Sequence, residues 1–256
     1  MTYLESIVIG VVEGFTEFLP ISSTGHMIVV EHWLGIAQSD LTKAYDVIIQ
    51  FAAILAVMLI YRQKLSPRKI GLWSKLFLAF LPLGIVGFLL RHQVKALFSV
   101  EVVAWMFIIG GVVFLIVEYF YREEAGERTT EVEAVSCRQA LAIGVAQIFS
   151  LIPGTSRAGA TIIGGLLAGL DRKTSAEFSF LLAIPVMAAV SGYDLLKHYH
   201  DFADAQWGPY LLGFVVAFVV AWLTIKLFLA FLSRFTFVPF GIYRILFGAY
   251  LLWALG

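Results

Sequence analysis

The sequence is poor in charged residues. Charged side chains make up 14% of the 256 residues and hydrophobic ones 60%, and the mean hydropathy is +0.89. A soluble globular domain carries about 25% charged residues, so this composition excludes that class and predicts a polytopic α-helical membrane protein. The formal net charge is zero. Without a basic stripe or an acidic tail, the charge pattern gives no indication of a nucleic acid partner.

The chain also has a single cysteine, Cys137. One cysteine cannot form an internal disulfide, and its place in a loop favours a small packing residue over a reactive thiol. No set of Cys and His indicates a zinc site. No Lys or Arg precedes the first polar cluster, as the basic region of a signal peptide would, so we expect the start of the chain to belong to the mature fold.

The first polar cluster is residues 13–26, EGFTEFLPISSTGH. Glu13 and Glu17 are four residues apart and share one face of a helix, which Pro20 interrupts. Two ionised carboxylates in apolar sequence are costly unless a cation or an arginine neutralises them. Oxygen ligands favour Mg²⁺ or Ca²⁺ over zinc. The simpler alternative is an ion pair that only joins two helices.

A hydroxyl-rich turn follows the proline. Ser22, Ser23 and Thr24 are good N-cap residues for a second helix, whose free amides and dipole favour an anion such as phosphate. His26 comes three or four residues after the two serines, so either hydroxyl lies on or near its face of the helix. The segment therefore supplies acids, nucleophiles and a base, although a satisfied buried histidine explains His26 equally well.

The same pattern begins again after residue 138. IGVAQIFSLIPGTSRAGAT at 143–161 resembles residues 9–27, with Pro153 in the place of Pro20 and Ser156 in that of Ser23. Each copy is too short and too interrupted to span a bilayer, which takes about 20 apolar residues. We interpret both as re-entrant helix hairpins, which are tolerated at membrane depth only when they pack in protein or line a wet cavity.

Three apolar spans follow each hairpin. They are predicted at 45–61, 76–90 and 102–121, and again at 177–196, 209–231 and 238–256. The span at 76–90 is short unless residues 72–75 or 91–98 extend it. An odd number of crossings per half inverts the second half relative to the first. The sequence therefore predicts an all-α polytopic membrane protein, with one membrane domain over 1–256 that consists of two inverted repeats, 1–125 and 139–256.

Basic residues are distributed unevenly between the two sides that this topology defines. One side collects Arg62, Lys64, Arg68, Lys69, Lys75, Arg122, Arg128, Arg138, Arg172, Lys173 and Arg234, and the other has only Lys43, Arg91, Lys95 and Lys197. The positive-inside rule places the first side in the cytoplasm. Both termini and the mouth of the first hairpin would then face outside, and the two hairpin tips would meet near the midplane.

Two arginines fall inside the predicted bundle. Arg157 is at the tip of the second hairpin, where a bidentate guanidinium suits a phosphate. The alternative is an arginine that binds backbone carbonyls at a helix end. Gly154 belongs to a second helix start with exposed amides, so an anion would be held from two directions. Arg244 lies in the last span, where we expect it to pair with an acid.

These segments resemble a known family, the integral-membrane undecaprenyl-pyrophosphate phosphatases linked with bacitracin resistance in bacteria. EGFTEFLPISSTGHM at 13–27 is similar to the family's first signature, PGTSRAGAT at 153–161 to its second, and EFSFLLAIP at 177–185 to a third stretch. The resemblance covers essentially the whole chain. Ala158 stands where the family usually has Ser, which leaves an extra phosphate hydrogen bond from that position unsupported.

The resemblance implies an enzyme that removes the terminal phosphate of C55 isoprenyl diphosphate and recycles the lipid carrier of peptidoglycan synthesis. It implies Glu13 and Glu17 as ligands of Mg²⁺ or Ca²⁺, and Ser23 as nucleophile, although the residues alone leave open whether Ser22, Ser23 or His26 attacks phosphorus. The implied catalytic set is Ser23, His26, Glu17 and Arg157. The implied phosphate-binding set is Ser22, Ser23, Thr24, Gly154, Thr155, Ser156 and Arg157. The site would open to the outer, periplasmic face of the bacterial inner membrane.

Three alternatives remain beside this function. A transporter or lipid flippase is the strongest, because many secondary transporters bind substrate between inverted repeats with broken helices. A pure carrier, however, needs no serine aligned with a histidine and carboxylates. A second lipid phosphatase family uses a histidine nucleophile without metal, but its Lys-x6-Arg-Pro motif is absent here. A purely structural protein would not need these buried charges. Small-residue spacings allow a homodimer without requiring one.

Overall fold

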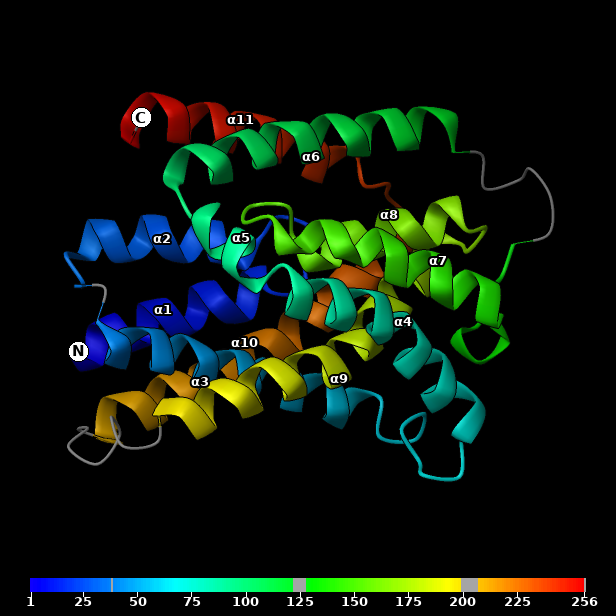
Figure 1. Ribbon diagram of the computed structural model, residues 1–256, viewed down its shortest axis with the longest axis horizontal. Helices are drawn as coiled ribbons and strands as arrows, with labels where there is room; N and C mark the ends of the chain where they lie inside the picture. The colour runs from blue at the N-terminus through cyan, green and yellow to red at the C-terminus, as the bar shows by residue number, and fades with distance from the viewer. Residues whose placement is uncertain (38, 122–127, 199–206, 256) are drawn as a thin grey trace.

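A computed structural model describes residues 1–37, 39–121, 128–198 and 207–255. Within these ranges the chain is helical, which confirms the predicted all-α class (Figure 1). The main helices are α1 (Tyr3–Thr16), α2 (Ser23–Leu34), α3 (Asp40–Ile60), α4 (Ile70–Leu89), α5 (Arg91–Ala96), α6 (Val100–Phe120), α7 (Cys137–Gln147), α8 (Arg157–Leu167), α9 (Arg172–His198), α10 (Trp207–Leu232) and α11 (Val238–Leu255). The repeat boundary predicted at residue 125, Arg122 and Gly256 lie outside the described residues.

Four helices are long and apolar enough to cross a membrane, namely α4, α6, α9 and α10. The other two predicted spans correspond to α3 and α11, whose apolar stretches are Tyr45–Ile60 and Val238–Ala254. The shortest spanning helices have about 17 apolar residues, so the stretch of α11 is at the lower limit and that of α3 is just below it. Each predicted span thus coincides with a helix.

Three helices begin five or six residues before the predicted spans, namely α3 at Asp40, α4 at Ile70 and α9 at Arg172. The helix α4 starts at Ile70 instead of residue 76, because Lys75 Nζ donates to the carbonyl oxygen of Glu133 (2.7 Å) and so does not interrupt it. The helix α9 starts at Arg172 instead of residue 177, because the Asp171 carboxylate accepts from the amide of Thr174 (2.6 Å) as an N-cap does.

Glu133 also joins the connector after α6 to this end of α4. Partial burial alone would raise the pKa of its carboxyl, but the hydrogen bond from Lys69 Nζ (2.9 Å) and the charge of nearby Lys64 hold that pKa below its ordinary value. This ion pair is partly exposed, so it fixes the position of the loop more than it stabilises the fold.

Large apolar side chains are exposed along the outer faces of three spans. They recur every three to four residues, as Leu81, Ile85 and Phe88 on α4, Ile109, Val112 and Ile116 on α6, and Val215, Val219 and Leu223 on α10. Such stripes would associate in water. In a multi-pass membrane protein they are the surface that faces lipid.

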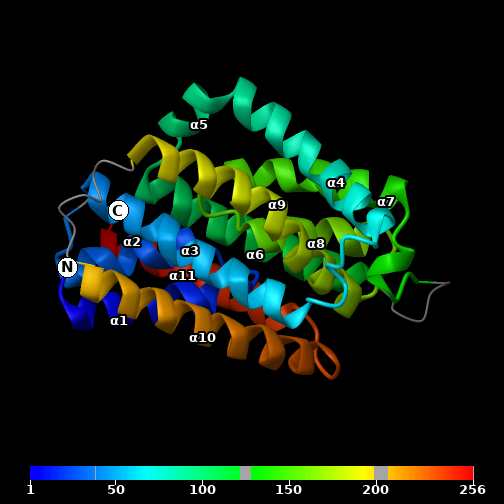
Figure 2. The same cartoon turned by 90° about the horizontal axis from the view of Figure 1, so that it is seen from below.

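The two hairpins approach one another along the long axis of the molecule (Figures 1 and 2). In Figure 1 both chain ends lie at the left, whereas the α3–α4 and α10–α11 connections lie at the right. The α1–α2 hairpin extends inward from the left and the α7–α8 hairpin from the right. Their turns therefore come together in the interior.

Glycines fix the first helix of each hairpin. A Cβ on Gly10 would lie 2.6 Å from the carbonyl oxygen of Gly213, and one on Gly14 would lie 2.6 Å from that of Ala217. A Cβ on Gly144 would likewise overlap the backbone of Ala79. Only glycine permits these backbone contacts, which press α1 onto α10 and α7 onto α4. These small residues serve contacts within one chain, and the homodimer stays a prediction.

Candidate active site

Both hairpins turn at a serine with a strained backbone. Ser22 precedes α2 with φ 68° and ψ 97°, and Ser156 precedes α8 with φ 74° and ψ 117°. A positive φ is rare outside glycine and costs about 1–3 kcal/mol, and it concentrates at functional sites. By this conformation Ser156 corresponds to Ser22. The predicted correspondence with Ser23 is therefore wrong by one residue, and Ser23 and Arg157 each begin a helix.

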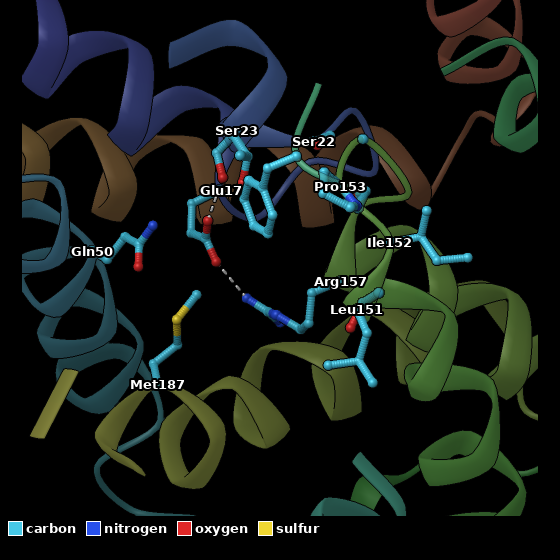
Figure 3. A pocket seen from close by; sticks show the side chains of 14 residues that line it. Glu17, Ser22, Ser23, Gln50, Leu151, Ile152, Pro153, Arg157 and Met187 are labelled. Atoms are coloured by element: carbon cyan, nitrogen blue, oxygen red, sulfur yellow. Dashed lines mark hydrogen bonds and ion pairs between the residues drawn. The ribbon is translucent and has the colours of Figure 1, made fainter. Parts of the chain in front are cut away.

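Glu17 connects the two tips (Figure 3). Its Oε2 accepts from Ser23 Oγ at 2.6 Å, and its Oε1 accepts from Arg157 Nη2 at 2.8 Å. The side chains of Glu17 and Arg157 are 6% and 10% exposed. Removing one partner of such a buried ion pair is strongly unfavourable. The structure thus brings Arg157 to the serines of the first hairpin, as predicted, with Glu17 between them.

A second contact orients the Arg157 guanidinium. Its Nη1 donates to the carbonyl oxygen of Ser179 on α9 at 2.9 Å. Thr161 Oγ1 lies 2.7 Å from Ser179 Oγ and 2.9 Å from the carbonyl oxygen of Arg157. The planar guanidinium is thereby held from two sides.

A cavity of about 130 Å³ lies between the tips. Six of the seven predicted phosphate-binding residues line it, together with Glu17 and parts of α3, α9 and the second tip. The lining residues are Glu17, Ser22, Ser23, Thr24, Gln50, Phe98, Ser150, Leu151, Ile152, Pro153, Gly154, Ser156, Arg157 and Met187. Thr155 lines a neighbouring apolar cavity beside α6 instead, so its side chain is not brought to the others.

His26 turns away from the serine hydroxyls. Its Nδ1 lies 2.8 Å from the carbonyl oxygen of Ser22, and its Nε2 lies 2.5 Å from Tyr243 Oη on α11. A carbonyl only accepts, so Nδ1 donates, and in the neutral ring Nε2 accepts from the tyrosine. The ring stacks on Phe247 at 4.5 Å. Within the described residues, the partner of Ser23 Oγ is therefore Glu17 and not the imidazole.

Glu13 lies one turn before Glu17, as the spacing predicts. Its side chain is 1% exposed, and its Oε1 has no hydrogen-bond partner within the described residues. It does not reach the wall of the cavity that Glu17 lines. An unpartnered buried carboxylate oxygen is costly, so this atom needs a proton or a cation.

Arg244 does not pair with an acid, so that prediction is wrong. Within the described residues its guanidinium donates to three carbonyl oxygens, those of Pro20, Met106 and Gly154. Its place in an apolar span suggested a carboxylate partner, but the tips of the two hairpins offer carbonyls that no helix satisfies.

Sequence reasoning missed several residues near the cavity. Gln50 on α3 lines both this cavity and a larger one of about 610 Å³, which Glu31 and Asp46 also line. Thr24 and Phe98 belong to both cavities as well. Asp46 and Gln50 are four residues apart in an otherwise apolar span, and polar residues on one face of such a span indicate a site or a pathway. That signal could have been recognised.

Known proteins resemble this chain over nearly its full length. Residues 6–250 match the family model described as bacitracin resistance protein BacA. A protein of Sulfurovum sp. (strain NBC37-1) named undecaprenyl-diphosphatase is 74% identical over 252 residues, which cover 98% of this chain and 99% of the relative. One of the same name from Sulfurimonas denitrificans is 64% identical over 252 residues, with 98% of each chain covered. Another from Persephonella marina is 55% identical over 248 residues, with 97% of each covered.

Proposed function

This chain belongs to the bacitracin resistance protein BacA family, and on that premise we propose that it hydrolyses undecaprenyl diphosphate to undecaprenyl monophosphate and phosphate. The observation that carries the proposal is the position of Glu17, which holds Ser23 on one side and Arg157 on the other at the edge of a polar cavity. The reaction would return the lipid carrier to peptidoglycan synthesis and give bacitracin resistance.

The cavity is suited to a diphosphate. Two helices, α2 and α8, begin at its wall with Ser23 and Arg157. A helix N-terminus carries free amides and a positive partial charge, which favour phosphate. Arg157 adds a full positive charge with a planar, bidentate donor set. Phosphoryl transfer needs this concentration of positive charge more than it needs covalent machinery.

Ser23 and Glu17 supply a nucleophile and its base. Glu17 takes the proton of Ser23 Oγ, and the oxygen attacks the terminal phosphorus. The bond from that phosphorus to the bridging oxygen breaks, and undecaprenyl monophosphate leaves. The proton also neutralises Glu17, so Arg157 loses its partner and can pair with the phosphate oxygens. Glu17 passes its proton to the monophosphate that leaves. Water then attacks the phosphoserine, the bond between phosphorus and Ser23 Oγ breaks, the serine oxygen takes a proton from that water, and phosphate is released.

We also propose a divalent cation as cofactor, Mg²⁺ or Ca²⁺, which Glu13 and the ionised Glu17 would hold before Glu17 takes the serine proton. The unpartnered Oε1 of Glu13 fits such a role, since both cations prefer carboxylate oxygens. Within the described residues, no three His, Cys, Asp or Glu side chains gather into a metal site, so Glu13 and Glu17 are the two carboxylates that would hold the ion. The bound ion would supply further positive charge to the diphosphate.

The proposed reaction is tested by phosphate release from undecaprenyl diphosphate, with purified protein in detergent and Mg²⁺, Ca²⁺ or EDTA. We expect release with at least one cation and a fall of at least about tenfold with EDTA, because the metal supplies charge that Arg157 alone does not replace. Release that EDTA leaves unchanged would remove the metal from the proposal. No release by folded protein in any condition would favour the transporter.

We propose that His26 positions the turn and does not transfer a proton. Its Nδ1–H holds the carbonyl of Ser22, next to the nucleophile. An asparagine amide can donate there, so His26→Asn should keep kcat within about tenfold of the unsubstituted enzyme, whereas His26→Phe should lose about 100-fold. Steady-state kinetics on both variants decides between the roles. Equal, large losses would instead make His26 the acid or base.

We further propose that residues 1–125 and 139–256 are inverted repeats within one membrane domain. In support, α1 and α7 each carry a glycine in an Ile-Gly-Val sequence at their contact with a span of the other half. Ser22 and Ser156 also share one unusual backbone conformation. The basic side would face the cytoplasm and the site would open to the periplasmic face of the inner membrane.

A further inference from the structure

Arg244 on α11 is a fully buried charge, with 0% of its surface exposed. Its Nη1 donates to the carbonyl oxygen of Pro20 at 3.1 Å, and its Nη2 donates to the carbonyl oxygen of Gly154 at 2.9 Å. Nη2 also lies 2.9 Å from the carbonyl oxygen of Met106 on α6. One side chain thus binds both hairpin tips and a span.

A buried guanidinium whose hydrogen bonds, within the described residues, all go to carbonyl oxygens is an expensive way to join helices. Packed apolar residues often stabilise a fold as well as a buried charge does. The planar fork, however, fixes the directions of its donors, which an apolar side chain or a lysine cannot do. The bonds to Pro20 and Gly154 therefore set the spacing between the two tips.

That spacing matters for the site. Pro20 lies two residues before Ser22 and three before Ser23, while Gly154 lies two before Ser156 and three before Arg157. Ser23 and Arg157 therefore each follow, by three residues, a carbonyl group that Arg244 binds. A change in tip spacing would move Ser23 relative to Arg157.

The sequence around Arg244 is arranged for this contact. Gly110 on α6 has no side chain, and a Cβ there would overlap the guanidinium. The neighbouring Tyr243 bonds to His26 on α2. Two successive residues of the last helix therefore hold the first hairpin, and one of them also holds the second.

We propose that Arg244 is a positioning residue, which holds the two hairpin tips at the separation that phosphoryl transfer requires. The inference rests on the proposed function, since it assigns Ser23 and Arg157 their roles. It differs from a structural role because it predicts a loss of turnover in protein that remains folded.

The first test is kinetic. Arg244→Met should lower kcat by about 10- to 100-fold with a smaller change in KM, because misplacement of reacting groups by an ångström costs about that much. Arg244→Lys should recover only part of the loss. The exposed Arg234 serves as the matched control, and Arg234→Met should keep wild-type turnover. If the activity lost in Arg244→Met were no larger than its unfolded fraction accounts for, the proposal would be overturned.

Gly110→Ala provides a second variant that retains the arginine. It should lower kcat by displacing the guanidinium, again by about tenfold or more. The double variant Gly110→Ala with Arg244→Met should be no slower than Arg244→Met alone, because both changes remove the same contacts. Losses that multiply in the double variant would mean that the two residues act separately, and would contradict the positioning role of Arg244.

The third test does not depend on activity. Spin labels are attached at Thr24 and Ile152, one on each tip, in protein whose Cys137 is replaced by serine. The distribution of distances between the two labels should be broader or shifted in the Arg244→Met variant, compared with labelled protein that retains Arg244. An unchanged distribution would contradict the proposal even in an inactive protein. If the unlabelled, unsubstituted protein released no phosphate while the distance distribution changed in Arg244→Met, the proposed function alone would be overturned.

Discussion

Ser23→Ala is expected to lower phosphate release from undecaprenyl diphosphate by at least about 10⁴-fold, because it removes the proposed attacking oxygen. Ser23 Oγ lies 2.6 Å from Glu17 Oε2, which is the separation of a nucleophile from its base. Loss of one hydrogen-bonding group to phosphate costs about 10²–10³-fold at most. The measurement is a single-turnover assay with the folded fraction determined in parallel.

The matched control is the preceding serine. Ser22 lines the same cavity but makes no side-chain cap bond, and Ser22→Ala should lose no more than about 100-fold. Acid quenching during turnover, followed by mass spectrometry, should find phosphate on Ser23. If Ser23→Ala retained activity at the level of Ser22→Ala, water would be the nucleophile and Ser23 a phosphate ligand.

Arg157→Lys is expected to lower kcat by about 10³-fold although the positive charge is retained. An arginine that stabilises the phosphoryl transition state contributes about 10³–10⁵-fold, and lysine cannot bind both Glu17 and the Ser179 carbonyl as the planar fork does. Rates at saturating substrate measure the loss.

The chain offers a second buried arginine–glutamate pair as a control. Arg172 Nη2 donates to Glu118 Oε2 at 2.6 Å, and Arg172 Nε to Oε1 at 3.0 Å, away from the cavity. Arg172→Lys should lower the thermal midpoint and leave the turnover of folded protein unchanged. Similar turnover losses in both variants would mean that Arg157 only supports the fold.

The sequence allowed both hairpins and the residues at their tips to be predicted. Pro20 and Pro153 interrupt apolar runs that are too short to span a membrane, and the internal similarity placed Ser23 and Arg157 at corresponding turns. Their contact through Glu17 follows if the tips meet. Charge in an apolar sequence carries this information, because a buried charge needs an opposite charge or hydrogen-bonding groups beside it.

The finer geometry could not be predicted. Helical spacing gives the face on which His26 lies but not the direction of its ring, and its partner Tyr243 is 217 residues away. The partners of Arg244 are backbone carbonyls, which every residue has and which leave no mark in the sequence. The equivalence of Ser22 with Ser156 depends on a backbone angle, since adjacent Ser and Thr residues are equally good caps.

The packing of α1 onto α10 has a consequence for how the protein is made. The glycine face of α1 is covered by residues 207–232, which leave the ribosome after most of the chain. Until then the glycine face of α1 has no cover, although α3 already packs against another part of this helix. Domains that join distant segments complete late and expose their interiors meanwhile. The first hairpin therefore cannot take up its complete packing in the membrane until α10 has been synthesised and inserted.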